Sequence, residues 1–181
     1  MKKILLVLFT AVSVGCVTNT YFISGESKPE SNTANPLNFN PNLQGEIIET
    51  GRELDLAIVG PGYFEIALPN GGSVFTRNGH FYRNSIGEIC ISGGLVMKSA
   101  PAIDHNTQEI IISVDGLITC KMDDTANTYK YVGQITLIDF ENPYGLIHLG
   151  NGLYLAGADC GDSKMVNPQF SLLRQGFLEK R

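Results

Sequence analysis

The sequence predicts an all-β fold: a single domain of many short, mostly antiparallel strands, arranged as a sandwich or a partly open barrel. From about Gly45 onward, short apolar or alternating runs are separated every few residues by Gly, Asn, Asp and Pro. No long amphipathic helix, heptad run or internal repeat occurs in the 181 residues. At most one short helical turn is therefore expected.

The predicted strands are short runs rich in β-branched and aromatic residues. The first group comprises residues 46–50, 55–59, 63–68, 73–77, 81–84, 89–92 and 95–98, and the second comprises residues 110–114, 117–121, 130–139 and 153–156. The tight turns between them are predicted at residues 69–72, 78–79, 85–87, 115–116 and 151–152. The sequence NPYGLIHL at residues 142–149 predicts the helical turn, with Asn142 as its cap and Pro143 at its first position.

The first 15 residues have the pattern of a secretory signal peptide. A positive start, MKK, precedes an apolar run at residues 4–12, and small residues follow at 13–15. The apolar run is too short to span a bilayer as a helix. The Val-Gly-Cys that ends at Cys16 resembles the lipobox of bacterial lipoproteins, which implies lipid attachment at Cys16. Ser13 departs from the Leu, Val or Ile usual at that lipobox position, so plain secretion is the alternative.

Several acyl chains on Cys16 would hold the protein on a membrane durably. Val17 follows Cys16 where many lipoproteins retained at the inner membrane have Asp, and by the same resemblance this indicates the periplasmic face of the outer membrane. Residues 16–44 are rich in Asn, Ser, Thr and Pro and have no apolar period. They predict a flexible tether that leads to the β-domain of residues 45–181.

Charge and cysteine content exclude several classes of protein. Removal of the signal peptide would leave 11 of the 13 basic residues against 18 acidic ones, a net charge of −7. An acidic chain without basic clusters is not expected to bind nucleic acid. If Cys16 is acylated, Cys90, Cys120 and Cys160 allow at most one disulfide, and their spacing fits no metal site. They are interpreted as small buried side chains.

The sequence LDLAIVGPGYFEI at residues 54–66 contains the feature most like an active site, a Gly-Pro-Gly between two apolar runs. A phosphate-binding glycine loop needs a helix after it, whereas the β-prone YFEI follows here. The turn is therefore interpreted as a corner, in which Gly60 and Gly62 adopt backbone angles that a side chain would obstruct. His80, His105 and His148 form no local pattern with a nucleophile. No catalytic residue, cofactor, metal or small-molecule substrate is predicted.

A series of motifs between Gly45 and Glu179 resembles the bacterial flagellar rod and hook proteins, most closely the distal rod protein. TGRELDLAI at residues 50–58 is similar to the family's T-G-x-x-L-D-x-A-I, GPGYF at 60–64 to G-x-G-F-F, and FTRNGHF at 75–81 to Y-T-R-x-G-x-F. Further matches in the same order are GEICISGG at 87–94, IIISVDG at 110–116, VGQITL at 132–137, NPYGL at 142–146, LGNGLY at 149–154 and QGFLE at 175–179. The framework positions that this resemblance indicates are Gly51, Leu54, Asp55, Gly60, Gly62, Phe64, Arg77, Gly79, Phe81, Gly116, Asn142, Gly145 and Gly176.

The resemblance implies a structural, non-enzymatic component of the flagellar basal body that packs against rod, hook or ring proteins and forms oligomers through lateral contacts. Family members also carry long helices at both ends, the second starting just after the motif that QGFLE matches. Arg181 lies two residues past that motif, so we expect the outer β-domain of a rod protein without these helices. The alternative is an envelope lipoprotein that uses the same domain as a binding or assembly module outside the flagellum.

Overall fold

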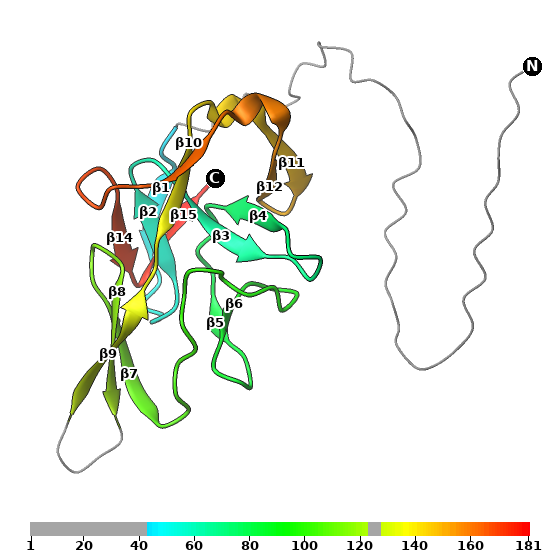
Figure 1. Cartoon of the computed structure of the whole chain (residues 1–181). Coiled ribbons are helices and arrows are strands. Elements are labelled where there is room, and N and C mark those ends of the chain that lie inside the picture. Colours follow the sequence, from blue (N-terminus) through cyan, green and yellow to red (C-terminus); the bar gives the residue numbers. More distant parts are fainter. Residues whose placement is uncertain (1–42, 123–127) are drawn as a thin grey trace, which may run out of the picture. The chain divides into compact units, whose positions relative to one another are not determined.

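The computed structural model describes residues 43–122 and 128–181. Within these ranges the regular structure is mostly β-strand and every named strand pair is antiparallel, which confirms the predicted all-β fold (Figure 1). The expected signal peptide, Cys16 and most of the expected tether lie outside the described residues. No helix in the described part of the chain is long and apolar enough to cross a membrane.

The strands are short, and glycine-containing turns join many of them. In the first half they are β1 (Glu46–Glu49), β2 (Leu56–Val59), β3 (Tyr63–Ala67), β4 (Ser73–Thr76), β5 (Tyr82–Arg83), β6 (Ile89–Cys90) and β7 (Thr107–Ile112). In the second half they are β8 (Leu117–Met122), β9 (Tyr129–Gln134), β10 (Leu137–Phe140), β11 (Leu146–Gly150), β12 (Leu153–Ala156), β13 (Ser163–Met165), β14 (Leu172–Gln175) and β15 (Phe177–Lys180). The 3-10 helices η1 (Pro143–Gly145) and η2 (Ala158–Cys160) lie before β11 and after β12.

The largest sheet has six strands in the order β11-β12-β4-β3-β10-β13. Its two ends are different strands, so it is not a closed barrel. β7, β8 and β9 form a three-stranded sheet, and β5 pairs with β6. The two remaining pairs, β2 with β14 and β1 with β15, bring the last strands of the chain back beside the first ones (Figure 1).

Most predicted strands are present, and the main differences lie from residue 95 onward. The strand predicted at residues 95–98 is reduced to single bridges from Val96 to Cys90 and from Met97 to Ile66. The single strand predicted at 130–139 is two strands, because the chain leaves the β8–β9 ladder at Ile135, whose N–H donates to the carbonyl of Gly116. The helical turn predicted at 142–149 is wrong beyond Gly145, since β11 begins at Leu146.

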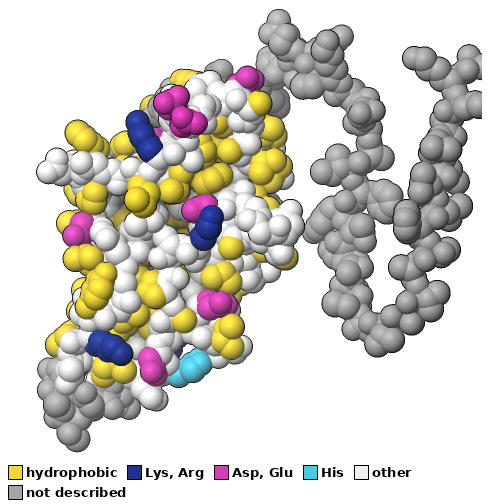
Figure 2. Space-filling model, in the orientation of Figure 1, with side chains coloured by type: hydrophobic (Ala, Val, Ile, Leu, Met, Phe, Trp, Pro, Cys, Tyr) yellow, Lys and Arg dark blue, Asp and Glu magenta, His cyan; other side chains and the backbone are white. Residues whose placement is uncertain are grey.

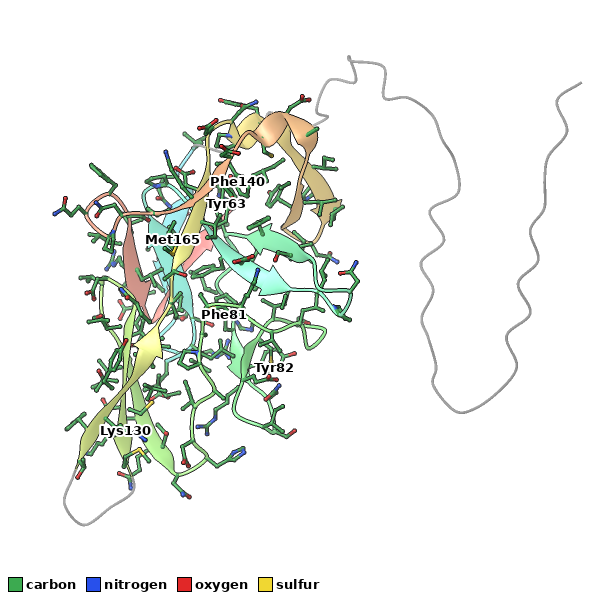
Figure 3. All side chains as sticks on the ribbon, viewed as in Figure 1. Tyr63, Phe81, Tyr82, Lys130, Phe140 and Met165 are labelled. Atoms are coloured by element: carbon green, nitrogen blue, oxygen red, sulfur yellow. The ribbon has the colours of Figure 1, made fainter. Side chains whose placement is uncertain are left out.

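The hydrophobic core has two parts, one on each face of the six-stranded sheet. Alternation along β3 puts Phe64 and Ile66 in the larger cluster, while Tyr63 points the other way. The larger cluster also receives Leu56 and Ile58 of β2 together with Phe81, whose ring meets that of Phe64 edge to face at 4.9 Å. The smaller cluster is aromatic, and Figure 3 shows Tyr63 and Phe140 close together in it.

Candidate functional site: the buried arginine at the Gly-Pro-Gly turn

The Gly-Pro-Gly turn carries the chain from β2, which pairs with β14, into β3 of the six-stranded sheet. Gly60 and Gly62 have φ angles of 108° and 109°, a region that side chains rarely adopt. A Cβ on Gly62 would lie 2.8 Å from Cγ2 of Val166, and one on Gly60 would meet the carbonyl oxygen of Phe170. Strands lie on both sides of the turn, so the helix that a phosphate-binding loop requires is not there.

Arg77 follows β4 and places its guanidinium directly beneath this turn. Its side chain is 4% exposed, yet each of its five N–H donors has an acceptor. The acceptors are the carbonyl oxygens of Gly60 at 2.9 Å, Gly62 at 2.8 Å and Ile58 at 3.1 Å, Oε1 of Gln44 at 3.4 Å and Oε2 of Glu179 at 2.7 Å. The cation that the carbonyls of the turn bind is therefore the guanidinium of Arg77, a side chain of the protein itself.

Glu179, on β15, supplies the opposite charge and is itself fully buried, with 0% of its side chain exposed. Besides the bond from Arg77, its carboxylate accepts hydrogen bonds from the backbone N–H of Gly45 at 2.7 Å and from Nε of Arg181 at 2.9 Å.

Gln44 adds a second connection between the start of the described chain and the turn. Its side-chain amide donates to the carbonyl of Ile58 and accepts the N–H of Gly60. The start of the described chain and its last strand thus meet at one buried ion pair.

Burial changes the acid-base properties of the groups around this pair. Burial alone would raise the pKa of Glu179, but the hydrogen bonds from Arg77, Gly45 and Arg181 outweigh it and the pKa is lowered. Glu179 therefore stays ionised opposite Arg77. Burial raises the pKa of neighbouring Tyr63 to about 12, so its hydroxyl stays neutral.

A second cluster lies where Gly51 and Gly176 face each other beyond the ends of β1 and β15. The carbonyl of Gly176 accepts the N–H of Gly51 at 3.1 Å, and its own N–H donates to the carbonyl of Asp55 at 2.8 Å. The Asp55 carboxylate is buried and lies 2.9 Å from Nη1 of Arg52 and 3.0 Å from Nδ1 of His80. This cluster therefore joins the start of the described chain to its end.

Gly79 and Phe81 extend the second cluster. The N–H of Phe81 donates to the carbonyl of Leu54, and the carbonyl of Gly79 accepts the N–H of Leu56. A Cβ on Gly79 would collide with the backbone carbonyl of Leu56. Six of the framework positions indicated by the sequence therefore meet here: Gly51, Leu54, Asp55, Gly79, Phe81 and Gly176.

The remaining framework positions lie apart from both clusters. Phe64 is in the core, and Gly116, with φ of 85°, accepts the hydrogen bond that ends β9. Gly145 packs so tightly on the backbone of η2 that a Cβ would meet Asp159 and Cys160. The expected capping role of Asn142 is wrong, because its side chain makes no cap bond and donates to the carbonyl of Asp159 instead. Pro143 does stand at the start of η1.

Glu179 and Gln44 are the important residues that the sequence did not single out. Glu179 belongs to the QGFLE motif, but nothing local distinguishes it from an exposed acidic residue. Its partner Arg77 lies 102 positions earlier, and Gln44 fell inside the expected tether. A buried arginine after a strand requires a buried acid, yet no spacing in the sequence says which one it is.

The other chemically reactive side chains are not assembled into a site. Cys90, Cys120 and Cys160 are buried and unpaired. Among residues 43–122 and 128–181, no group of three or more His, Cys, Asp or Glu is arranged to hold a metal ion. On the face shown in Figure 2, Lys and Arg side chains lie apart from one another rather than in a cluster.

Comparison with known proteins identifies the family. Residues 57–120 match the family described as the flagellar hook protein FlgE/F/G D1 domain. The flagellar basal-body rod protein FlgG of Caulobacter vibrioides is 37% identical over 139 residues, which cover 75% of this chain and 53% of the relative. FlgG of Borreliella burgdorferi is 35% identical over 143 residues, with the same two shares.

A differently named rod protein also matches. FlgF of Caulobacter vibrioides is 30% identical over 138 residues, again 75% of this chain and 53% of the relative. The chain spans about half the length of the curated relatives it matches. Over the residues that these comparisons match, the chain belongs to the flagellar rod and hook protein family.

Proposed function

We propose that this protein is a structural, non-enzymatic component of the bacterial flagellar basal body, similar to the distal rod protein. In this role its β-domain packs against rod, hook-base or ring proteins. The observation that carries the proposal is the 37% identity to a basal-body rod protein over 139 residues, which make up 75% of this chain. Lateral contacts between β-domains would supply the assembly.

The way the domain uses its buried charges supports a structural role. Arg77 and Glu179 are bonded to each other and to backbone groups, and the Asp55 carboxylate lies against Arg52 and His80. Arg77 and Glu179 also line a hollow beside Tyr154 and Arg181, but all five donors of Arg77 are already bonded to acceptors of the protein itself. In this domain the buried charges join distant segments of the chain.

Deletion of the gene tests the proposed function. We expect loss or marked slowing of swimming, and tomographic maps of the motor that lack density beside the distal rod, hook base or rings. Complementation with the full chain should restore both. Unchanged swimming together with an unchanged motor map would overturn the proposal and would favour the alternative module outside the flagellum.

We also propose that Cys16 carries a lipid anchor that holds the protein at the periplasmic face of the outer membrane. The supporting observations are the signal-peptide pattern and the lipobox-like Val-Gly-Cys. Cys16→Ser should abolish incorporation of labelled palmitate and release the protein to the soluble periplasmic fraction. Cys90→Ser is the matched control and should label normally, because the Cys90 thiol is buried against the carbonyl of Tyr82. A wild-type protein that is soluble in the periplasm and never labels would indicate simple secretion.

A further inference from the structure

The strand pair β1–β15 is the point at which the described chain both begins and ends. The two strands pair over four positions, from Glu46 opposite Lys180 to Glu49 opposite Phe177, and neither belongs to another sheet. A two-stranded ribbon of this length is marginally stable by itself. β1 is also mostly exposed, so burial of its side chains contributes little to its position.

Side-chain hydrogen bonds join the two strands at the outer end of this ribbon, where Glu46 pairs with Lys180. Glu179 accepts the N–H of Gly45, and the guanidinium of Arg181 donates to the carbonyl of Leu43 at 2.6 Å as well as to Glu179. Beyond the ribbon, the Glu179 carboxylate reaches only one cation of the main body among the described bonds, the buried Arg77. Through Arg77 the ribbon is connected to the three carbonyls around the Gly-Pro-Gly turn. Beside this ion pair, Gln44 bonds to Ile58 and Gly60, and Arg181 bonds to the side chain of Tyr154.

We propose that Arg77 and Glu179 form a latch: while it is closed, the β1–β15 ribbon is held against the Gly-Pro-Gly turn, and when it is released the ribbon opens as a unit while the sheets behind it stay folded. The inference does not depend on the proposed function. A closed latch transmits a pull on either end of the ribbon directly to the six-stranded sheet, whereas an open one lets the ribbon separate first.

The geometry explains why release should be local. The backbone bonds of the ribbon run between β1 and β15, and at its inner end Thr50, Gly51 and Gly176 join it to Asp55. β3 and β8, by contrast, are held in sheets packed around the large core cluster. Loss of the Glu179 charge replaces the ribbon's ion pair with Arg77 by at most a hydrogen bond to an uncharged acceptor, and it removes none of the backbone bonds of those sheets.

Amide hydrogen exchange on the full chain near neutral pH tests the latch. In Glu179→Gln, amides of β1 and β15 should exchange at least ~100-fold faster than in the wild type and should remain faster than those of β3 and β8. Amides of β3 and β8 that exchange through global unfolding should accelerate by no more than the same factor, because global unfolding breaks the same ion pair. Glu49→Gln is the matched control on the same ribbon, since Glu49 is exposed, and it should leave all four strands unchanged. No acceleration in β1 and β15, or exchange of all four strands with one common free energy of opening, would overturn the proposal.

A second measurement on the wild type needs no substitution. With small additions of denaturant, exchange of β1 and β15 should proceed through an opening with weaker denaturant dependence than that of β3, because less surface is exposed. If the ribbon and β3 exchange through one common opening without denaturant, the ribbon does not open as a unit and the latch is wrong.

Discussion

Arg77 shows how one side chain is fitted to the backbone around it. A guanidinium is planar and cannot lose its charge in a protein, so burying it requires acceptors on every side. The Gly-Pro-Gly turn supplies two of them, the carbonyls of Gly60 and Gly62, and both of these glycines have positive φ angles. A lysine at this position has fewer donors and no planar fork, so it would leave part of that set of carbonyls without a partner.

Glu179 makes the stability of the protein dependent on pH in a predictable direction. Its pKa is lowered in the folded state relative to the usual 4.5, so the folded state favours the ionised form. This stabilisation is fully present above about pH 4.5 and is lost as the pH falls through the lower pKa of the folded state. At neutral pH, Glu179→Gln should reduce the free energy of unfolding by about 3 kcal/mol, because it leaves Arg77 buried without its counter-charge.

Urea unfolding between about pH 6 and pH 3 measures this effect. The wild-type free energy of unfolding should fall with acid more steeply than that of Glu179→Gln, so the difference between the two proteins should shrink at low pH. Glu49→Gln, which removes an exposed carboxylate, should keep the wild-type slope. Parallel curves for the wild type and Glu179→Gln would show that this carboxylate does not have a lowered pKa.

At the scale of the elements, the turn between β2 and β3 has two separate requirements for glycine at position 62. Its φ of 109° disfavours any side chain, and Val166 and Leu137 leave no room for one. Gly62→Val should therefore lower the free energy of unfolding by about 3 kcal/mol or more and reduce the melting temperature. Gly93→Val tests the backbone angle alone, because Gly93 has φ of 97° but no atom within 4 Å of an added Cβ.

The comparison of these two variants by thermal unfolding separates the causes. Gly93→Val should cost roughly 1–2 kcal/mol, the strain of a positive φ for a β-branched residue. Equal losses in both variants would show that packing around the turn does not matter. An unchanged melting temperature for Gly62→Val would contradict the interpretation of the turn as a sterically fixed corner.

The elements that sequence reasoning predicted share a physical cause, as do those it missed. β2, β3 and β4 are runs of apolar residues between glycine-containing turns, and burial confirms the pattern. Four strands were not predicted: β11, β13, β14 and β15. β13 is short and exposed, β11 begins in a motif that also fits a helical turn, and β14 and β15 are only partly buried. Their pairing depends on neighbouring strands already in place, and local sequence does not record that.

At the scale of the whole molecule, the framework positions that the motifs indicate meet in space mainly because the chain returns to its start. Gly51 and Gly176 are adjacent because β15 pairs with β1. The same pairing places Glu179 within hydrogen-bond distance of Arg77. The order of motifs could predict that both ends belong to one domain. Which side chains touch depends on the register between strands more than 100 residues apart, and no periodicity in the sequence specifies that register.

The two hydrophobic clusters lie on opposite faces of one sheet, so we expect them to unfold together. Ile66 points into the large cluster, whereas Tyr63 and Tyr154 lie in the aromatic cluster on the other face. The sequence has no Trp and seven Tyr, and among the described residues only Tyr63 and Tyr154 are buried. The change in tyrosine fluorescence on unfolding therefore reports mainly the aromatic cluster, while circular dichroism follows the strands. Ile66→Val should cost about 1 kcal/mol and lower both transitions by the same few degrees, roughly 3–4 °C.

The two clusters share one sheet, and neither face can keep its packing once β3 and β4 separate. The fluorescence and dichroism transitions are therefore expected to have the same midpoint. Leu155→Val, on the exposed continuation of the same sheet, is the control and should leave both midpoints within about 1 °C, since surface changes of this size cost little. If tyrosine fluorescence kept its wild-type midpoint in Ile66→Val while the dichroism midpoint fell, the aromatic cluster and its strands would form a separate folding unit.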